Sequence, residues 1–415
     1  MRKISLIGLV MLIVSIPTFA GGLLTNTNQH AAFLRMLSRG ATTEIDGALS
    51  NPAGLAFLPN DGFHVGLSIQ SAFQTRNIDA SFLTYSGFDG TKPTVSDQPY
   101  NKYYKGKAAA PVIPSLFAAY KKGDWTISGF FAITAGGGKA SFDDGLPMFE
   151  SAAMAGIFKG SLDNHIKDNR SPIVTPDMYN INSAMDGKQY IYSVQLGLTY
   201  KINDWLSAFA GGRMNYFTGG YQGFLRANLK EALGGTQLME PLELDCDQTG
   251  WGLTPVIGVD AKFGKFNIGA KYEFKTNLNI ENNTKENTAA EGALAAFKHG
   301  VNTPNDIPSM LSVAVAYEFM PVLRASVEYH FYDDKKAGMA DDKQKFLTKG
   351  TNEYLAGIEW DVTKYLTLSC GGQITDYGLS DNFQSDTSFS CDSYTLGFGA
   401  KVKLSERAAL NVGYM

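Results

Sequence analysis

Apolar and polar residues alternate with a period of two in several stretches of this chain. From Leu323 to Tyr332, one face carries Leu, Ala, Val, Tyr and Phe, and the other carries Arg, Ser, Glu, His and Tyr. The same division recurs over residues 266–275 and 393–404. A period of two predicts β-strands with one dry and one wet face. Because a soluble sandwich would alternate too, the period predicts strands but not their surroundings.

The lengths of the connections narrow the choice of fold. Alternation predicts about thirteen strands, which start near residues 62, 114, 125, 189, 205, 251, 266, 309, 322, 353, 365, 393 and 408. Short connections (121–124, 201–204, 264–265, 320–321, 361–364 and 404–407) alternate with long polar ones (roughly 74–113, 136–188, 217–250, 278–308, 333–352 and 378–392). Outer-membrane barrels have short periplasmic turns and long extracellular loops. The chain is therefore predicted to be all-β, with a transmembrane antiparallel β-barrel over residues 62–415.

Aromatic residues bracket the short connections. Four of five such turns carry an aromatic residue on both sides: Tyr120 and Trp125, Tyr200 and Trp205, Phe263 and Phe266, and Trp360 and Tyr365. Amphipathic rings gather where hydrocarbon meets water, so we expect an aromatic girdle at the periplasmic interface. A soluble core would not explain why the rings cluster at turns.

The strand count is odd, whereas single-chain bacterial barrels have an even number of strands. With the N-terminus in the periplasm, the thirteenth strand (408–415) would end outside the cell. Either a strand inside a long connection lacks the pattern, or the sequence given stops before a fourteenth strand. We favour the second explanation, because short and long connections stay in phase to the end.

The first twenty residues are typical of an export signal peptide. Arg2 and Lys3 precede an apolar run from Ile4 to Ile16, and Ala20 closes a small-residue cleavage site. The run is too short to span a bilayer, and no later apolar run reaches 18 residues. The mature chain is therefore predicted to be exported, and the bacterial outer membrane is its expected location.

Composition and cysteine usage exclude several classes of protein. Charged residues make up 18% of the chain and the net charge is −4, which gives no basic surplus for binding nucleic acid. The three cysteines, Cys246, Cys370 and Cys391, form no CxxC motif, and Cys370 and Cys391 are out of register as a pair. We therefore expect no cofactor and no metal, and assign the cysteines no role.

Residues 21–61 precede the first strand and lack the alternation of a barrel strand. They include residues 31–40, which could form a helical turn or two. They also include the apolar stretch from Leu49 to Asn60, whose two prolines and glycine suit neither a helix nor a regular strand. A segment of this length at the mouth of a barrel can fold into the lumen. We interpret it as a plug, or hatch, with a flexible periplasmic tail as the alternative.

A short motif lies before the first predicted strand and resembles that of a known family. It consists of Asn51, Pro52, Ala53 and Gly54. The order of export signal, segment of about forty residues, Asn-Pro-Ala-Gly and about fourteen strands resembles the outer-membrane long-chain fatty-acid transporter (FadL/TodX) family. The motif gains its specificity from this position, and the missing last strand is the one clear departure. The resemblance implies a monomer whose hatch, including these four residues, gates passive uptake. Long-chain fatty acids or aromatic hydrocarbons would leave sideways through a kink in the third strand.

The predicted third strand (125–135) ends in Gly136, Gly137 and Gly138, which permit a bend or bulge in the wall. These glycines are the candidate lateral opening, with the start of a long loop as the alternative. A phosphate-binding loop is disfavoured by the spacing and because no helical pattern follows. For a ligand carboxylate, Lys139 beside the glycines and Arg35 or Arg39 in the hatch are the candidate cations.

These predictions describe a non-enzymatic channel for a hydrophobic small molecule. Each buried methylene is worth about 0.8 kcal/mol, so an apolar pocket above the hatch would concentrate a poorly soluble ligand. The expected partners are that ligand and outer-membrane lipids. Alternatives are a general porin, an adhesin, and a barrel-embedded lipid hydrolase. The hydrolase is disfavoured because none of the five histidines lies in a recognisable serine motif, and His330 is more simply a lumen residue.

Overall fold

The structure is a computed structural model that describes residues 30–384 and 390–415. The predicted export signal and the first residues of the predicted hatch lie outside the described residues. Within the described residues, thirteen strands follow one another in chain order around an antiparallel sheet, as the alternation predicted. They are β1 (Gly62–Phe82), β4 (Tyr100–Lys122), β5 (Trp125–Phe142), β6 (Tyr179–Lys201), β7 (Leu206–Leu229), β8 (Leu242–Phe263), β9 (Phe266–Glu273), β12 (Met310–Met320), β13 (Leu323–Tyr332), β14 (Thr351–Asp361), β15 (Leu366–Asp376), β16 (Ser393–Lys403) and β17 (Ala409–Tyr414).

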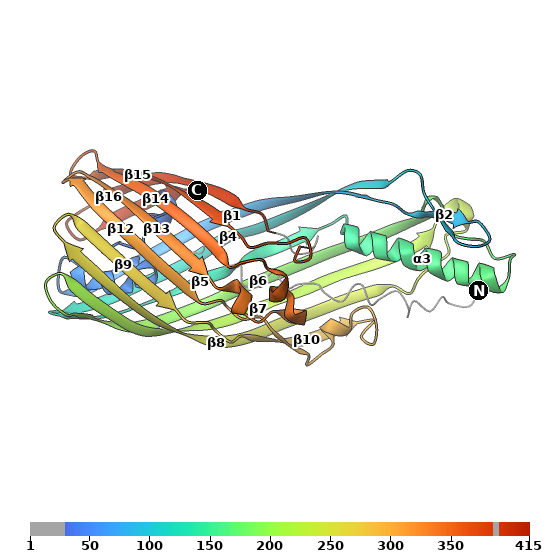
Figure 1. Cartoon of the computed structure of the whole chain (residues 1–415), viewed down its shortest axis with the longest axis horizontal. Coiled ribbons are helices and arrows are strands. Elements are labelled where there is room, and N and C mark those ends of the chain that lie inside the picture. The colour runs from blue at the N-terminus through green and yellow to red at the C-terminus, as the bar shows by residue number, and fades with distance from the viewer. Residues whose placement is uncertain (1–29, 385–389) are drawn as a thin grey trace.

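The strands are long and tilted, and they form a wall around the N-terminal segment (Figure 1). Short turns join them at one end, which we name the turn end. Longer connections lie at the other end, the loop end, and carry α3 (Pro147–Lys167), the ribbon of β2 (Tyr85–Phe88) and β3 (Pro93–Val95), and the strands β10 (Asn279–Asn287) and β11 (Asn302–Pro304). No helix in residues 30–384 or 390–415 combines the length and apolar character needed to cross a bilayer.

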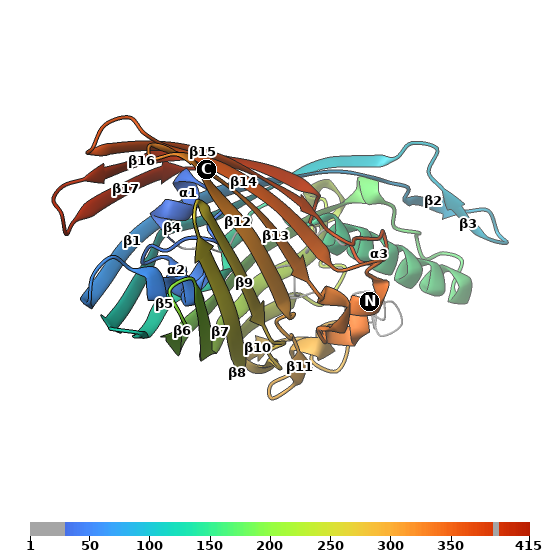
Figure 2. The same ribbon diagram turned by 60° about the vertical axis from the view of Figure 1, so that its left-hand side comes forward.

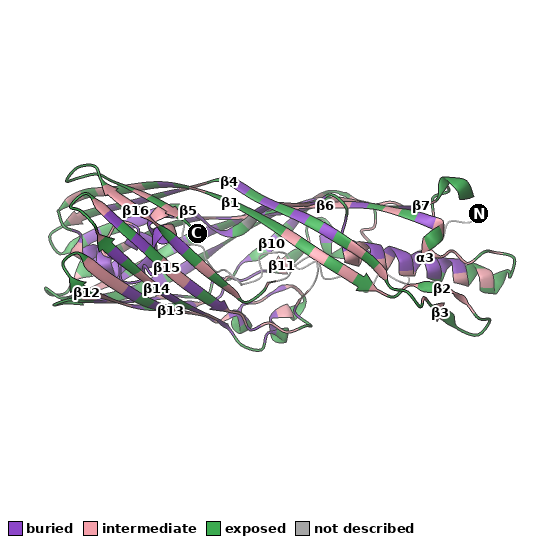
Figure 3. Ribbon diagram, turned by 90° about the horizontal axis from the view of Figure 1, so that it is seen from above, coloured by how far each residue is buried: buried purple, intermediate pink, exposed green. Residues whose placement is uncertain are grey.

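The wall is apolar outside and polar inside. On β1, Phe63 and Leu67 point outward and are 83% and 74% exposed. The inward side chains near the turn end are polar and buried, for example Ser128, Gln195 and Lys271. Figure 3 shows the resulting alternation of buried and exposed residues along strands such as β1 and β4. Water-soluble proteins bury their apolar side chains instead, so this distribution is the reverse of that in a soluble barrel.

Aromatic rings border the apolar belt at the turn end, as predicted. Rings on neighbouring strands lie against each other there: Phe63 against Tyr120, with centroids 4.7 Å apart, and Trp125 against Tyr200, with centroids 4.5 Å apart. On β1 the belt extends outward as far as Phe73, and the next outward residues are Thr75, Asn77, Asp79 and Ser81. The apolar belt therefore covers only part of the length of the longest strands.

The longest strands continue well beyond the belt, and here the predicted strand starts were wrong. β4, β6 and β8 begin at residues 100, 179 and 242, not near 114, 189 and 251. Outside the belt, the outer face carries charged pairs such as Lys188 Nζ with Asp247 Oδ1 at 2.9 Å. The contrast between dry and wet faces disappears there, so alternation could not mark the strands. Much of the predicted long loops is consequently strand.

Two further predictions about the chain have separate outcomes. The expectation that no helical pattern follows Gly138 was wrong, because α3 begins nine residues later; its apolar and small residues are spread around the helix and give no clear stripe. The order of strands starts at β1 and ends at β17, and these two are not paired with each other in the described residues. A fourteenth strand stays a prediction.

Candidate functional site

The N-terminal segment, residues 30–58, lies inside the wall at the turn end (Figure 2). It folds into α1 (Ala31–Arg35), α2 (Gly47–Ser50) and the 3-10 helix η2 (Pro52–Phe57). Almost all of it is buried. α1 packs on β16 and β17, and η2 packs on β5 to β8. The segment therefore spans the lumen from one side of the wall to the other.

Side chains of the wall hold the segment by its backbone carbonyl groups. The donors come from β4, β6, β7 and β9 at distances of 2.6–2.9 Å: Lys121 to Leu58, Gln195 to Ala48, Thr199 to Pro52, Ser207 to Ala53, Asn267 to Ala41 and Lys271 to Leu49. Short or irregular helices leave carbonyl oxygens without intrahelical partners. The polar inner wall supplies those partners, which explains why so short a segment is ordered.

The predicted hatch motif forms a compact turn against the wall. Asn51 donates from Nδ2 to the carbonyl of Thr42 at 3.0 Å and to the carboxylate of Asp260 on β8. Pro52 begins η2, where a missing N–H does no harm. A Cβ at Gly54 would lie 2.4 Å from Asn51 Nδ2 and 2.5 Å from the Thr42 oxygen, so only glycine fits. The gating role of these residues, including Ala53, stays a prediction.

Replacing Asn51 with alanine should weaken the docking of the segment. The change removes both side-chain hydrogen bonds and takes a donor from the buried Asp260 carboxylate, which together should cost about 2 kcal/mol. Limited proteolysis of the folded protein should then cut within residues 40–58 much faster than in the wild type. Alanine at the exposed Asn60 is the matched control. Equal protection of all three proteins would contradict this role of Asn51.

Glycines on the inner wall let the segment approach closely. A Cβ at Gly269 would lie 2.1 Å from the oxygen of Gly40, and a Cβ at Gly397 would lie 2.4 Å from the oxygen of Leu34. A Cβ at Gly413 would lie 2.6 Å from the nitrogen of Arg35. The backbone of the segment contacts the backbone of the wall at these points, so the wall accommodates the segment closely in this position.

A cluster of charges joins the segment to β13, β14 and β16. Arg35 donates to Ser369 at 3.0 Å and to Asn411 at 2.9 Å, and it also bonds to Glu359. Arg39 grips both carboxylate oxygens of Asp46 at 2.7 Å. The cluster holds four cations and four anions: Arg35, Arg39, Arg324 and Lys401 with Glu44, Asp46, Glu359 and Asp361.

The structure does not bring the three predicted carboxylate-binding cations together. Arg35 and Arg39 are buried and engaged within the neutral cluster. Lys139 lies on the outer face of the wall, where its Nζ is 2.9 Å from Asp186 Oδ2. Sequence reasoning could not see these partners, because Glu359 follows Arg35 by 324 residues. A role for these cations in binding a ligand carboxylate stays a prediction.

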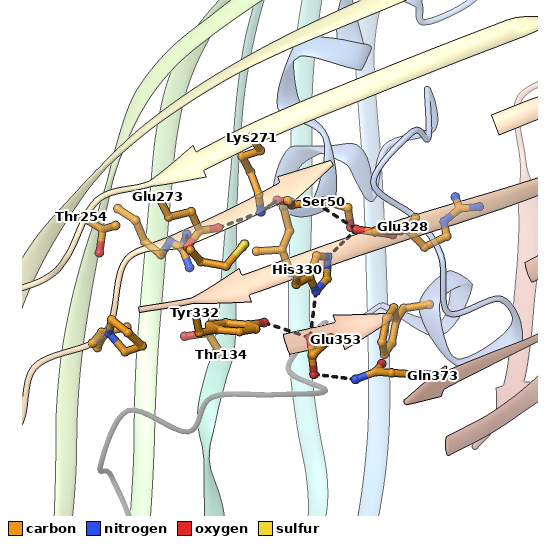
Figure 4. Close-up of a pocket in the computed structure, with 18 of the residues that line it drawn as sticks. Ser50, Thr134, Thr254, Lys271, Glu273, Glu328, His330, Tyr332, Glu353 and Gln373 are labelled. Carbon is orange, nitrogen blue, oxygen red and sulfur yellow. Dashed lines mark hydrogen bonds and ion pairs between the residues drawn. The ribbon is translucent and has the colours of Figure 1, made fainter. Parts of the chain in front are cut away.

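A cavity lies beside the segment on its loop-end side, and polar, charged and apolar residues all contribute to its lining (Figure 4). It encloses about 860 Å³ that protein atoms do not fill, part of it open to solvent. His330 sits between two carboxylates, with Nε2 2.6 Å from Glu328 and Nδ1 2.8 Å from Glu353. Lys271 bonds to Glu273 at 2.7 Å. Apolar side chains also line the cavity, so the cavity directly above the hatch is mixed in character, whereas a purely apolar pocket was expected.

Gly136 and Gly138 lie where the wall loses its strand pairing. The pairing of β4 with β5 stops at Ala109 and Lys139 and resumes at Ser115 and Ala132. Between these two pairs the strands are unpaired. Gly136 and Gly138 have φ of +112° and +72°, which other residues rarely adopt. The pairing of β5 with β6 also shifts here. The backbone of Gly137 lies within the same gap.

Two prolines on β4 face this interruption, and sequence reasoning missed them. Pro111 and Pro114 cannot donate to a neighbouring strand, and the register between β1 and β4 shifts at the same level, near Ser71. Two prolines three residues apart, one at the end of a predicted long connection and one at the start of the next predicted strand, were the available signal. The interruption lies at the outer edge of the apolar belt, because Phe73 is the last apolar outward residue of β1.

An apolar pocket at the loop end also escaped the sequence analysis. It lies among β6, β7, β8, α3 and the connection that contains Leu294, and encloses about 500 Å³. Its lining is almost wholly apolar and includes Phe149, Met185, Leu225 and Leu244. These residues are far apart in sequence, so only the folded wall brings them together.

The reversed wall and the occupied turn end define a transmembrane β-barrel with its N-terminal segment inside. The fold is that of the FadL and TodX group of outer-membrane channels. A structure of a Pseudomonas aeruginosa FadL homologue matches 94% of this chain and 88% of that chain, with 14% identity and a TM-score of 0.60. The match to the Pseudomonas putida toluene transporter TodX covers 92% of this chain and 91% of that chain, with 13% identity and a TM-score of 0.54. The match to the Ralstonia pickettii toluene transporter TbuX covers 92% of this chain and 91% of that chain, with 14% identity and a TM-score of 0.52.

No protein-family model and no curated protein matches the chain. At these identities, the likeness establishes the shared fold, and the resemblance seen in the sequence is confirmed at that level. Within the described residues, no group of three or more His, Cys, Asp or Glu side chains is arranged to hold a metal ion.

Proposed function

We propose that this chain is an outer-membrane channel for passive uptake of hydrophobic small molecules. The observation that carries the proposal is the relative placement of three features. An apolar pocket lies at the loop end, an interruption of the wall lies at the edge of the apolar belt, and the N-terminal segment occupies the turn end. Two neighbours of the same fold are described as toluene transporters, which supports the ligand class.

The short turns would face the periplasm and the long strands would extend outside the cell, as in outer-membrane barrels generally. In this orientation the apolar pocket is the outermost binding position. A poorly soluble ligand gains about 0.8 kcal/mol for each methylene that it buries. The pocket among Phe149, Leu225 and Leu244 would therefore capture ligand directly from the medium.

Inward from the pocket, a second apolar cluster leads toward the interruption. Ala135, Ile191, Phe217, Leu278 and Ile280 pack together and are buried. Ala135 lies directly before Gly136 on β5. A ligand leaving the pocket would thus follow apolar side chains to the unpaired stretch of β5. Beyond it lies the hydrocarbon of the bilayer, so a sideways exit avoids the aqueous periplasm.

The N-terminal segment acts as a hatch in this proposal. Straight passage would require breaking its bonds to four strands and separating the buried charge cluster, and breaking a buried ion pair alone costs about 3–5 kcal/mol. Charged side chains such as Glu273 and Glu328 in the cavity next to the hatch also favour water over an apolar ligand. Sideways exit is therefore the less costly route, and hatch movement would serve to widen the passage.

The capture step can be tested by placing a polar group in the pocket. Replacing Leu244 with asparagine should lower the rate of toluene uptake into proteoliposomes about tenfold, because a buried amide without partners costs about 1–3 kcal/mol. Asparagine at the exposed Leu233 is the matched control. Wild-type uptake by the Leu244 variant would remove the pocket from the pathway, and no uptake by the wild type would end the toluene proposal.

A general porin is the main alternative and predicts an open channel. A large, steady single-channel conductance of the intact chain in planar bilayers would favour it over a channel for hydrophobic ligands. The hydrolase alternative receives no support from His330, because carboxylates occupy both ring nitrogens.

A further inference from the structure

One row of inward positions crosses the wall at the level of the interruption. Strand register pairs Gly138 with Gln189, Gln189 with Gly219, and Gly219 with Gln248. Gln189 of β6 is therefore flanked on both neighbouring strands by residues that have no side chain.

Gln189 separates two apolar clusters on the inner wall. The inward residues of β6 are, in order, Met185, Gly187, Gln189 and Ile191. Met185 belongs to the cluster at the apolar pocket, and Ile191 belongs to the cluster beside Ala135. A ligand that moves along β6 from the first cluster to the second passes this amide.

The amide of Gln189 is buried and lacks hydrogen-bond partners in the part of the chain that the structure describes. The residue is 6% exposed, and neither Nε2 nor Oε1 has a hydrogen-bond partner among the described residues. The neighbouring Gln248, by contrast, donates to Asn282 at 2.8 Å, and Gln195 donates to the carbonyl of Ala48 at 2.9 Å. Buried amides nearly always have partners, and an unpaired one is costly. A partner from outside the protein would meet this need.

We propose that Gln189 binds the polar end of a hydrophobic molecule that carries an O–H group, as that molecule reaches the lateral opening. This inference rests on the proposed channel function and narrows its substrate class. An amide offers one donor side and one acceptor side. A neutral carboxylic acid or an alcohol offers the complement, since its O–H donates to Oε1 and its oxygen accepts from Nε2.

The surroundings of Gln189 favour a neutral head group over an ionised one. The nearest candidate cation by register, Lys139, lies on the outer face in an ion pair with Asp186. A carboxylate would find a donor in Nε2 but would leave Oε1 without a partner. An ionised group would also be costly to transfer onward into hydrocarbon. The ligands that Gln189 would hold are therefore long or aromatic apolar molecules that end in a neutral hydroxyl or acid group.

Head-group selectivity of uptake tests the proposal. The full chain is reconstituted in phospholipid vesicles, and uptake of radiolabelled 1-dodecanol, dodecanoic acid and n-dodecane is measured against protein-free vesicles. Q189L should slow uptake of 1-dodecanol and dodecanoic acid about tenfold, as expected for the loss of two hydrogen bonds. Uptake of n-dodecane should stay the same or rise, because the amide no longer interrupts the apolar path.

Two further variants keep the test decisive. Q248L removes an inward glutamine from the same row, but one that is already bonded to Asn282, so its selectivity should match the wild type. Q189M keeps the length of the side chain without the amide and replaces Q189L if that variant does not fold.

Each outcome has a separate meaning. Equal slowing of all three compounds by Q189L would assign Gln189 a structural role and overturn the proposal. Unchanged selectivity would mean that buried water satisfies the amide, which also overturns it while leaving the channel function intact. If the wild type takes up none of the three compounds, the channel function itself fails.

Discussion

Deleting residues 31–58 should convert an occluded barrel into a steadily conducting one. The inner wall that the segment covers is polar, with Gln195, Asn267 and Lys271 among the groups that would become exposed to the lumen. A polar lumen without a plug fills with water and conducts ions. Single-channel recording in planar bilayers should therefore show a large, constant conductance that the intact chain lacks.

The control for this deletion removes residues 86–94 from the β2 and β3 ribbon. Among the described strands, β2 and β3 pair with each other and with no third strand, and they lie at the loop end. Their loss should therefore leave the conductance unchanged. Heat-dependent migration on gels should show that both shortened chains keep a folded barrel. An unchanged conductance in a folded chain without residues 31–58 would show that the segment does not close the lumen.

Valine at Gly136 or Gly138 should slow the uptake of hydrophobic ligand about tenfold, the equivalent of about 1.4 kcal/mol. A Cβ at Gly136 would lie 2.2 Å from the carbonyl of Gln189, and one at Gly138 would lie 2.7 Å from the carbonyl of Ala109. Both residues also have positive φ, which strains a β-branched residue. β5 would straighten to relieve these contacts and would pair again with β4, closing the opening. Uptake of toluene into proteoliposomes measures the effect.

Gly123 supplies a control with the same backbone strain. Its φ is +58°, and nothing lies within 4 Å of the position of its Cβ. Valine there should reduce the stability of the turn between β4 and β5 but leave uptake near the wild-type rate. Normal uptake by folded Gly136 and Gly138 variants would place the lateral opening elsewhere in the wall.

Sequence patterns predicted this fold well where the chain meets the bilayer. Residues such as Leu67 face lipid while neighbours such as Ser68 face the lumen, so apolar and polar residues alternate in the sequence of these strands. Beyond the belt both faces meet water, and Asp186 and Lys188 give no alternation to read. The predicted strand starts were wrong there for that reason. Helix α3 was not predicted, because its apolar residues form no clear stripe.

The candidate site was predictable only in its local parts. The prolines and glycine near Asn51 identified the N-terminal segment, and the glycine run identified the interruption of β5. The fate of Arg35 depended on Glu359 and Asn411, which only the closed wall brings near. The special position of Gln189 could not be predicted, because the sequence does not show that its neighbours on both adjacent strands are glycines.

The position of α1 has a consequence for the order of assembly. Its first residue, Ala31, donates to Ser68 on β1 at 3.1 Å, and Arg35 donates to Asn411 on β17 at 2.9 Å. The earliest part of the described chain therefore cannot complete its contacts until the latest part has been synthesised and inserted. Contacts between such distant residues form slowly. Residues 30–58 would wait, unprotected from proteases, while the wall forms around them, and their protection would report that the two edges of the sheet have been brought together.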